Sequence, residues 1–171
     1  MKILETERLI LRHLQSDDVD ALFAFYSDPQ ITQFIPDAPT SWEETQSELS
    51  WFCNGHPEHP QLGLWATIHK ESQQFIGRCG LLPWTVDERL EVEVAYAIKK
   101  EFWGQGLATE AAQAVLDYGF NRLHYSRLVS LIDSDNIASI RVAEKIGMQF
   151  EKEGQDDWGT FELYVKHAPT A

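Results

Sequence analysis

The fold of this 171-residue chain is decided by one short stretch, WGQGLATE at residues 103–110. It connects residues 90–98, whose alternation is typical of a strand, to residues 104–122, whose small and apolar residues follow helical spacing. A helix that begins here offers N–H groups without intrahelical partners and the positive end of the helix dipole. Because small residues leave those amides uncovered, the stretch predicts a pyrophosphate site. The small residues stand at alternate positions: Gly104, Gly106 and Ala108.

Two other phosphate-binding loops are excluded by the residues that follow Gly106. A P-loop needs Lys and then Ser or Thr after its last glycine, whereas Leu107 and Ala108 stand here. A dinucleotide fingerprint needs Gly or Ala three residues after Gly106, where the chain has Thr109. Taken alone, a Gly-x-Gly turn is equally consistent with a tight connection from strand to helix.

The patterns around this stretch predict one domain, residues 1–171, of the α/β (α+β) class. Asp17 is expected to cap a helix whose Val19, Leu22, Phe23 and Tyr26 form its buried face, and Ser41 with Glu44 forms a capping box. The predicted order, β-α-α-β-β-β-α-β-α-β-β, lacks the regular βαβ alternation of a doubly wound sheet and excludes that fold. It indicates a mixed sheet of about seven strands, with four helices in all that are divided between its two faces. The predicted strands are residues 9–14, 64–69, 74–82, 90–98, 127–132, 148–153 and 158–166, and the helices are residues 17–28, 41–52, 104–122 and 136–147.

Charge and composition limit the classes of molecule that the protein can bind and the compartment in which we expect it. The chain has 27 acidic and 14 basic residues, a net charge of −13. Such a surface repels nucleic acid and attracts cations, although the charge could equally serve solubility alone. No apolar run approaches a membrane span, and residues 1–8 carry charges where a signal peptide is apolar, so we expect a cytoplasmic protein. Cys53 and Cys79 are expected to be buried thiols, and the spacing of His56 and His59 does not indicate a metal site.

Several motifs together resemble the GNAT superfamily, and within it the RimJ/RimL branch, whose named members acetylate the N-terminal amine of ribosomal proteins. The resemblance covers nearly the whole chain. It implies the GNAT fold, with strands splayed at an acetyl-CoA site, and an acetyl-CoA-dependent N-acetyltransferase activity that uses no metal. The motifs that carry it are residues 5–12 with Asp17-Asp18, residues 91–98, residues 104–111, residues 136–148 and Asp157-Trp158-Gly159.

The resemblance also assigns residues to the cofactor. The superfamily pattern is Arg or Gln, two residues, Gly, one residue, then Gly or Ala; Trp103 occupies its first position here and gives up a polar side chain there. The backbone of residues 96–98 should pair with the amides of pantetheine by strand addition. Asn136 should reach the pantetheine arm and can also cap its helix, with Ser139 at the third position. The full set is Tyr96, Ala97, Ile98, Trp103, Gly104, Gln105, Gly106, Leu107, Ala108, Thr109 and Asn136.

Acyl transfer to an amine needs a neutral amine, donors for the oxyanion and a leaving thiolate. Glu93 matches the Glu that precedes the Gly/Ala-Tyr pair in this branch and is the first candidate for the base, acting directly or through a water; its alternative role is an ordinary strand glutamate. Backbone N–H groups near Ala95 and Tyr96 are candidate oxyanion donors. Many superfamily members have a Tyr acid where this chain has Ala143, so Ser139 is a substitute acid, or else coenzyme A leaves as a thiolate that solvent protonates.

The acceptor is expected to be a primary amine, bound by a monomer or a homodimer. An α-amine has a pKa of about 7.7–8.0, against about 10.4 for lysine, so an α-amine such as a protein N-terminus suits a site with one base. Acetylation of a polyamine, amino acid or antibiotic remains an alternative, as does a silent acyl-CoA-binding protein. Specificity should come from the first two helices and residues 33–36 and 84–87.

Overall fold

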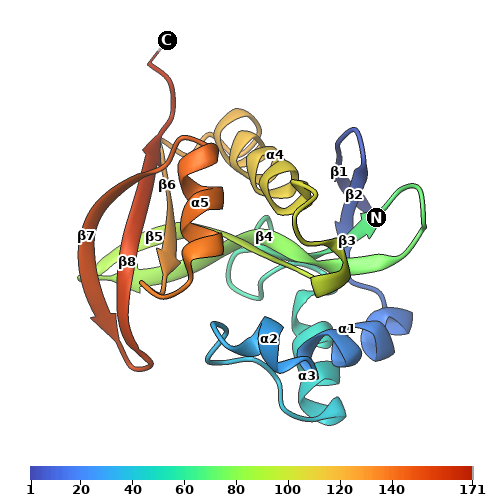
Figure 1. The fold of residues 1–171 in the computed structure, drawn as a ribbon. Coiled ribbons are helices and arrows are strands. Elements are labelled where there is room, and N and C mark those ends of the chain that lie inside the picture. Colours follow the sequence, from blue (N-terminus) through green and yellow to red (C-terminus); the bar gives the residue numbers. More distant parts are fainter. Residues whose placement is uncertain (171) are drawn as a thin grey trace.

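A computed structural model describes residues 1–170 of the chain (Figure 1). These residues form eight strands, five α-helices and two 3-10 turns at residues 16–18 and 100–102. The strands are β1 (Lys2–Glu5), β2 (Leu9–His13), β3 (Gly63–His69), β4 (Phe75–Val86), β5 (Arg89–Ile98), β6 (Arg127–Ile132), β7 (Gln149–Asp156) and β8 (Gly159–His167). The helices are α1 (Val19–Tyr26), α2 (Pro29–Thr32), α3 (Trp42–Phe52), α4 (Leu107–Asn121) and α5 (Ile137–Lys145).

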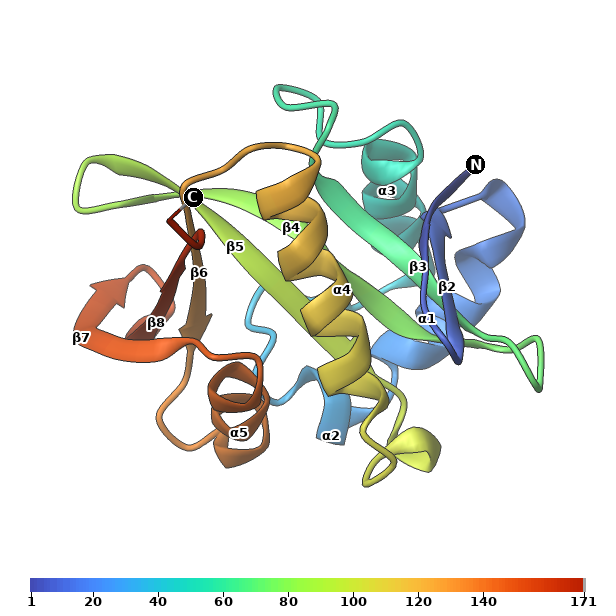
Figure 2. The same ribbon diagram turned by 90° about the horizontal axis from the view of Figure 1, so that it is seen from above.

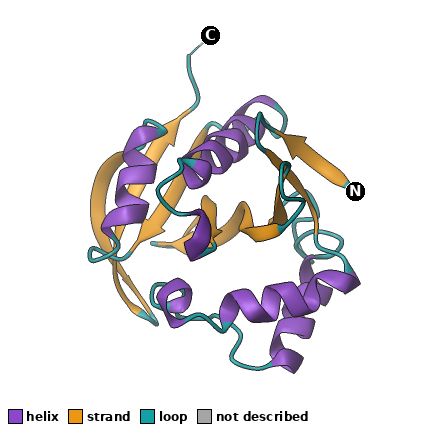
Figure 3. Ribbon diagram, turned by 45° about the vertical axis from the view of Figure 1, so that its right-hand side comes forward, coloured by secondary structure: helices purple, strands orange, loops and turns teal. Residues whose placement is uncertain are grey.

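The strands form one sheet in the order β1-β2-β3-β4-β5-β6-β8-β7. Every neighbouring pair is antiparallel except β5 and β6. Helices α4 and α5 cover one face, and α1, α2 and α3 cover the other (Figures 1 and 3). The predicted mixed sheet with helices on both faces is therefore confirmed. It gains β1 and the short α2, each of only four residues, too short to give a periodic pattern.

The predicted alternation along β5 is also confirmed. Val92, Val94 and Ile98 are buried in the core that α4 covers, whereas Ala95 and Ala97 pack against the core of α1 and α3. Helix α4 comes close to the sheet at Gly119, where an added Cβ would lie 2.7 Å from Leu128 Cδ1. The central strand β5 thus presents one set of side chains to each helical layer.

The predicted start of the first helix was wrong. Asp17 caps nothing, because residues 16–18 form a 3-10 turn. Asp18 is the structural residue: its carboxylate accepts hydrogen bonds from the Gln15 backbone N–H at 2.8 Å and from the Arg12 guanidinium at 2.6 and 2.8 Å.

The buried face of α1 was also predicted imperfectly. It carries Leu22, Phe25 and Tyr26, whereas Phe23 is only partly buried. Phe25 takes the core position because its ring meets Phe75 of β4 edge to face, with centroids 6.2 Å apart. That partner comes from a strand 50 residues further along, which the helical spacing alone cannot reveal.

The sheet ends at β7, a strand that pairs only with β8. It is mostly exposed and polar, with Glu151, Lys152 and Glu153 in succession. No helix within residues 1–170 is long and apolar enough to span a membrane.

Candidate active site

The site is built where β5 and β6, the only parallel pair of strands within residues 1–170, separate. Strands β5 and β6 share a single registered pair, Glu93 with Val129, and then diverge (Figure 2). Beyond that pair, the two strands are connected by hydrogen bonds between side chains and the backbone instead of by bonds between the two backbones. The Ser130 hydroxyl donates to the Val94 carbonyl at 3.0 Å, and the Leu131 N–H donates to Glu93 Oε1 at 3.2 Å. The predicted splay is confirmed, and it opens the sheet beside Glu93.

A cavity of about 1580 Å³ crosses this opening. One wall is formed by β5, the turn before α4, and α5; the other is formed by α2, α3 and the segment between them. The fold therefore gathers nearly all of the sequence-predicted site residues around one cavity. Gln105 is the exception and does not line it. The predicted residues that do are Glu93, Tyr96, Ala97, Ile98, Trp103, Gly104, Gly106, Leu107, Ala108, Thr109, Asn136 and Ser139.

Residues 103–109, here called the glycine turn, have a backbone that requires glycine. Gly104 and Gly106 adopt φ values of +73° and +76°, which L-residues rarely take. A Cβ added at Gly104 would meet nothing within 4 Å, and one at Gly106 would meet only Arg8 Nη2, at 3.7 Å. The first bond of α4 runs from the Glu110 N–H to the Gly106 carbonyl, so the N–H groups of residues 107–109 have no partner within the helix. This open, amide-lined corner fits a diphosphate.

Trp103 has a role that its sequence position does not reveal. Its indole N–H donates to the carbonyl of Ile98 at 2.6 Å, and the residue is 48% exposed. The residue that replaces the usual Arg or Gln therefore ties the glycine turn to the end of β5. Since a carbonyl has two lone pairs, Ile98 keeps one acceptor site for the predicted pairing with pantetheine.

Two residues that sequence reasoning missed hold the glycine turn from behind. Arg8 donates from Nε to Glu110 Oε2 at 2.7 Å and from Nη1 to the Gln105 carbonyl at 2.9 Å. Thr6 adds a hydroxyl bond to Glu110 Oε1 at 2.5 Å. Although burial opposes it, hydrogen bonds from Thr6 and Arg8 keep the pKa of Glu110 below its usual value. The motif at residues 5–12 contains both partners, but nothing in the sequence links it to Glu110.

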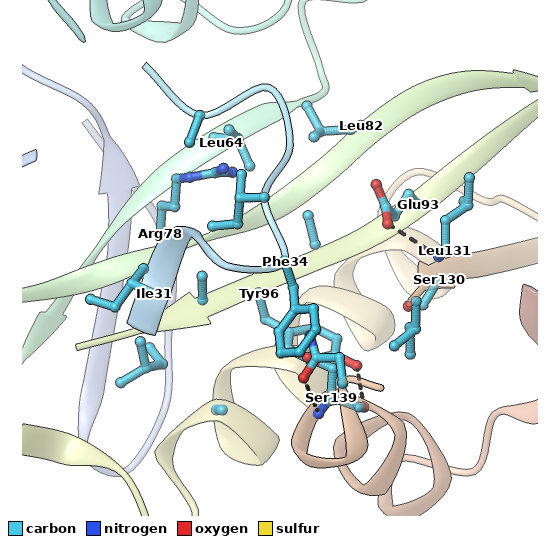
Figure 4. A pocket seen from close by; sticks show the side chains of 18 of the residues that line it. Ile31, Phe34, Leu64, Arg78, Leu82, Glu93, Tyr96, Ser130, Leu131 and Ser139 are labelled. Atoms are coloured by element: carbon cyan, nitrogen blue, oxygen red, sulfur yellow. Dashed lines mark hydrogen bonds between the residues drawn. The ribbon is translucent and has the colours of Figure 1, made fainter. Parts of the chain in front are cut away.

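Glu93 lies in the cavity wall on the face of β5 that carries Ala95 and Ala97. Its carboxylate accepts from the Leu131 N–H (Figure 4). It also accepts from the indole N–H of Trp84, at 2.6 Å. Burial raises the pKa of Glu93 to about 7, although these two donors favour its charged form. A carboxyl group with this pKa exchanges protons near neutral pH, as a general base must.

Helix α5 brings the remaining predicted residues to the opposite side of β5. The predicted N-cap is confirmed, because Asn136 Oδ1 accepts from the Ser139 N–H at 3.2 Å. The Tyr96 hydroxyl donates to the Ser139 carbonyl at 2.7 Å, and burial raises the pKa of Tyr96 above its usual value. Ala143 is fully buried and does not line the cavity, so position 143 does not face the site.

The acceptor side of the cavity differs in part from the expectation. Residues 33–36, Trp84 and the second predicted helix, α3, line it, but α1 contributes no lining residue. Trp84 also meets Trp158 of the β7–β8 hairpin, with ring centroids 6.1 Å apart. Trp51 stands at the cavity with a 60% exposed side chain, whereas Trp65 is a core residue.

The cysteines take no part in this site. Cys79 is fully buried, and burial raises its pKa to about 11, so it is a poor nucleophile. Cys53 is a free thiol at the end of α3 and only partly buried, less than expected. Within residues 1–170 no group of three or more His, Cys, Asp or Glu could hold a metal ion.

Comparison with known proteins gives one family, the GNAT acetyltransferases. Residues 8–149 match the model of the acetyltransferase (GNAT) domain. The chain is 35% identical to YkkB of Bacillus subtilis over 87% of this chain and 86% of that protein. It is 32% identical to the N-acetyltransferase p20 of Bacillus licheniformis over 90% and 85% of the two chains. Spermidine N(1)-acetyltransferase of Escherichia coli matches at 37% identity over 50% of each chain.

Solved structures show the same fold. A GNAT-family acetyltransferase from Bacillus anthracis superimposes with a TM-score of 0.82 at 24% identity, over 98% of both chains. RimL, the ribosomal L7/L12 alpha-N-protein acetyltransferase solved with coenzyme A, superimposes with a TM-score of 0.79 at 18% identity, also over 98% of both chains.

Proposed function

Because this chain belongs to the GNAT acetyltransferase family and is an acetyl-CoA-dependent acyltransferase, we propose that it acetylates an α-amine, the N-terminal amine of a peptide or protein, as a single catalytic domain. One observation carries the choice of amine. Glu93 stands at the splay with a pKa raised to about 7 by burial. An α-amine with a pKa of about 7.7–8.0 can pass its proton to such a carboxylate at little cost, whereas a lysine amine at about 10.4 cannot.

Glu93 acts as the general base. Trp84 and Leu131 hold its two carboxylate oxygens, which fixes the direction of the remaining lone pairs toward the cavity. The base takes a proton from the acceptor ammonium, directly or through a water, and the neutral amine attacks the acetyl carbon. No nucleophilic side chain is needed for this route.

The glycine turn and the end of β5 bind the co-substrate. The N–H groups of residues 107–109 hold the diphosphate, the backbone of Tyr96, Ala97 and Ile98 pairs with pantetheine, and the amide of Asn136 donates toward the same arm. Bound acetyl-CoA supplies the electrophilic thioester carbon. The open shape of the turn and its uncovered amides support this assignment.

The reaction also needs a hydrogen-bond donor for the oxyanion and an acid for the leaving sulfur, and we assign these roles to groups at the splay and on α5. The backbone N–H of Tyr96 stabilises the oxyanion where β5 has no ladder with β6, whereas the N–H of Ala95 is turned toward its β4 partner Gly80. Ser139 protonates the departing sulfur, and the bond from Tyr96 to its carbonyl holds that turn of α5 in place. Ser139→Ala should therefore lower kcat more than it raises KM.

A polyamine acceptor is the second candidate, because acidic side chains gather on the acceptor wall. Glu43, Glu44 and Glu48 line the cavity in a chain of net charge −13. One relative carries the name spermidine N(1)-acetyltransferase, whereas RimL carries that of an alpha-N-protein acetyltransferase. The names support both acceptor classes.

A panel of amines with acetyl-CoA, followed by thiol release, separates these candidates. It contains peptides with a free N-terminus, the same peptides blocked at the N-terminus with one lysine, spermidine and an aminoglycoside. We expect the free peptides to give the highest kcat/KM. A higher value for spermidine would replace the proposal with the polyamine acceptor, and acetyl-CoA binding without turnover on any amine would indicate a silent binder.

Glu93→Gln tests the base in the same assay. The wild-type rate should show an acid limb near pH 7, and the variant should lose it and follow the ionisation of the amine instead. The loss should be about 10²-fold or more at pH 7 and smaller at pH 9, where the amine is already neutral. An unaltered pH–rate profile would remove Glu93 from this role.

A further inference from the structure

Arg78 is a buried cation without a partner in the acceptor side of the cavity. It is only 8% exposed and lines the cavity. Among residues 1–170 its guanidinium has no ion pair within 4.0 Å and no hydrogen bond, and its buried Nε is left unsatisfied. Buried arginines keep their charge and are almost always paired, so an unpaired one requires an explanation.

The position of Arg78 points it at the acceptor. On β4, Arg78 stands opposite Ala97 and Leu82 stands opposite Glu93, so Arg78 and Glu93 share one face of the sheet. Figure 4 shows both side chains on that side of the strands, away from Tyr96 and Ser139. The rise of a strand places residues 97 and 93 about 13 Å apart at the backbone. An arginine side chain spans much of that distance.

Its surroundings hold Arg78 in place without neutralising it. The guanidinium carbon lies 5.3 Å from the ring centroid of Tyr26, a cation–π contact. Glu48, Asp37 and Glu93 are near enough to interact with the Arg78 charge, but none forms an ion pair with it within 4.0 Å. The Glu48 carboxylate already accepts the Tyr26 hydroxyl. The planar fork of hydrogen-bond donors is thus preorganised and unused.

We propose that Arg78 is a specificity residue that binds a carboxylate of the acceptor, so that the substrate is an amine carrying a carboxylate a few bonds away: an amino acid, a dipeptide, or a peptide with an acidic second residue. This rests on the proposed function, in which Glu93 receives the amine. A guanidinium binds a carboxylate with two parallel hydrogen bonds. The acidic groups around Arg78 favour a singly charged carboxylate over a phosphate dianion. A polyamine would instead bring a second cation to Arg78.

Paired acceptors that differ in one carboxylate test this inference, with kcat/KM expressed per neutral amine because the free carboxylate of alanine raises the pKa of its own amine. They are alanine and alaninamide, and the peptides Ala-Glu and Ala-Gln with amidated C-termini. We expect kcat/KM to favour the carboxylate member by about 10- to 100-fold, the range of one charge-assisted contact. The first pair tests a free amino acid and the second a peptide, so the two sources of the carboxylate are distinguished. Phosphoethanolamine against ethanolamine tests phosphate, and a preference there in place of the carboxylate pairs overturns the proposal.

Variants at position 78 assign the preference to this side chain. Arg78→Met keeps the apolar stem but not the charge, and should reduce the carboxylate preference to about onefold. Arg78→Lys should restore part of it. Arg122→Met removes an exposed arginine outside the cavity and should leave the preference at its wild-type value. An equal preference in wild type and Arg78→Met overturns the proposal.

A binding measurement separates failure of this inference from failure of the proposed function. Calorimetry with the N-acetyl products, in the presence of coenzyme A, requires no turnover. Tighter binding of N-acetylalanine than of its amide, lost in Arg78→Met, supports the carboxylate site even if no amine is acetylated. Turnover without any preference, or equal binding of the two products, overturns it.

Discussion

Arg8 and Glu110 join the start of the chain to the first turn of α4: the Nε and the backbone N–H of Arg8 both donate to the Glu110 carboxylate, at 2.7 and 2.9 Å. The two residues are 102 positions apart. Because the same guanidinium also donates to the Gln105 carbonyl, the pair fixes the position of the glycine turn, and neither residue lines the cavity.

Arg8→Ala should loosen that turn and weaken coenzyme A binding. Because the Arg8 side chain is 42% exposed, solvent screens its ion pair. Removing it should therefore cost only about 1 kcal/mol of binding free energy, which is about a fivefold rise in Kd by calorimetry. Lys2→Ala, which removes an exposed ion pair with Glu5 in the same segment, is the matched control and should not change Kd. Equal Kd values for Arg8→Ala and the control would contradict a role for Arg8 at the turn.

Gly106→Trp should abolish coenzyme A binding while the protein stays folded. The bulky side chain would displace Arg8, whose Nη2 lies 3.7 Å from the added Cβ, and would distort the turn that carries the amides, and the left-handed backbone would add about 1–2 kcal/mol of strain, which lowers Tm by about 2–8 °C. Gly159→Trp imposes a comparable backbone penalty, at φ +137° in the β7–β8 hairpin, where it should leave Kd as in wild type. Retained affinity in Gly106→Trp would locate the diphosphate elsewhere.

Trp84→Phe should move the acid limb of the pH–rate profile upward by about one unit. The indole N–H of Trp84 stabilises the charged form of Glu93, so its loss should raise a pKa that already stands at about 7. Trp158→Phe changes the neighbouring ring, which has no hydrogen bond to Glu93, and serves as control. If both variants kept the wild-type limb, Trp84 would not position the base.

Glu93 should also make the protein less stable as pH rises. Its folded pKa is raised from 4.5 to about 7, so the folded state binds more protons than the unfolded state between these values. Its stabilising contribution is complete below about pH 4.5 and is lost as pH rises through 7. Allowing for partial exposure, the loss is on the order of 1–2 kcal/mol.

Thermal denaturation of wild type and Glu93→Gln at pH 5 and pH 8 measures this contribution. The Tm of wild type relative to the variant should fall by about 2–8 °C between the two pH values. A difference that does not change with pH would mean that the pKa of Glu93 is not raised.

The sequence predicted what depends on local pattern. Alternation along residues 91–98 assigned Val94 and Glu93 to opposite faces, and the glycines before α4 marked the turn, because periodicity and left-handed backbone leave local signals. What it could not predict depends on residues brought together by the fold. Arg8 meets Glu110 across 102 positions, and the missing partner of Arg78 becomes visible only once all its neighbours are in place.

Trp103 could be predicted only in part from the sequence. Its position in the superfamily pattern was recognised, but the pattern implied only the loss of a polar side chain. The bond from its indole to the Ile98 carbonyl depends on the 3-10 turn at residues 100–102, which brings the ring back over the end of β5. Trp103 therefore departs from the superfamily pattern but has a structural role, which only the tertiary structure reveals.

The exposed row of charges along β7 bears on self-association. An unpaired strand at the border of a sheet invites a neighbouring molecule to extend it, and the charged side chains of Glu151, Lys152 and Glu153 oppose this because a junction would bring them out of water beside a second copy. Copies of this protein should therefore not join through β7 into a continuous sheet, and a homodimer would have to form through another part of the surface.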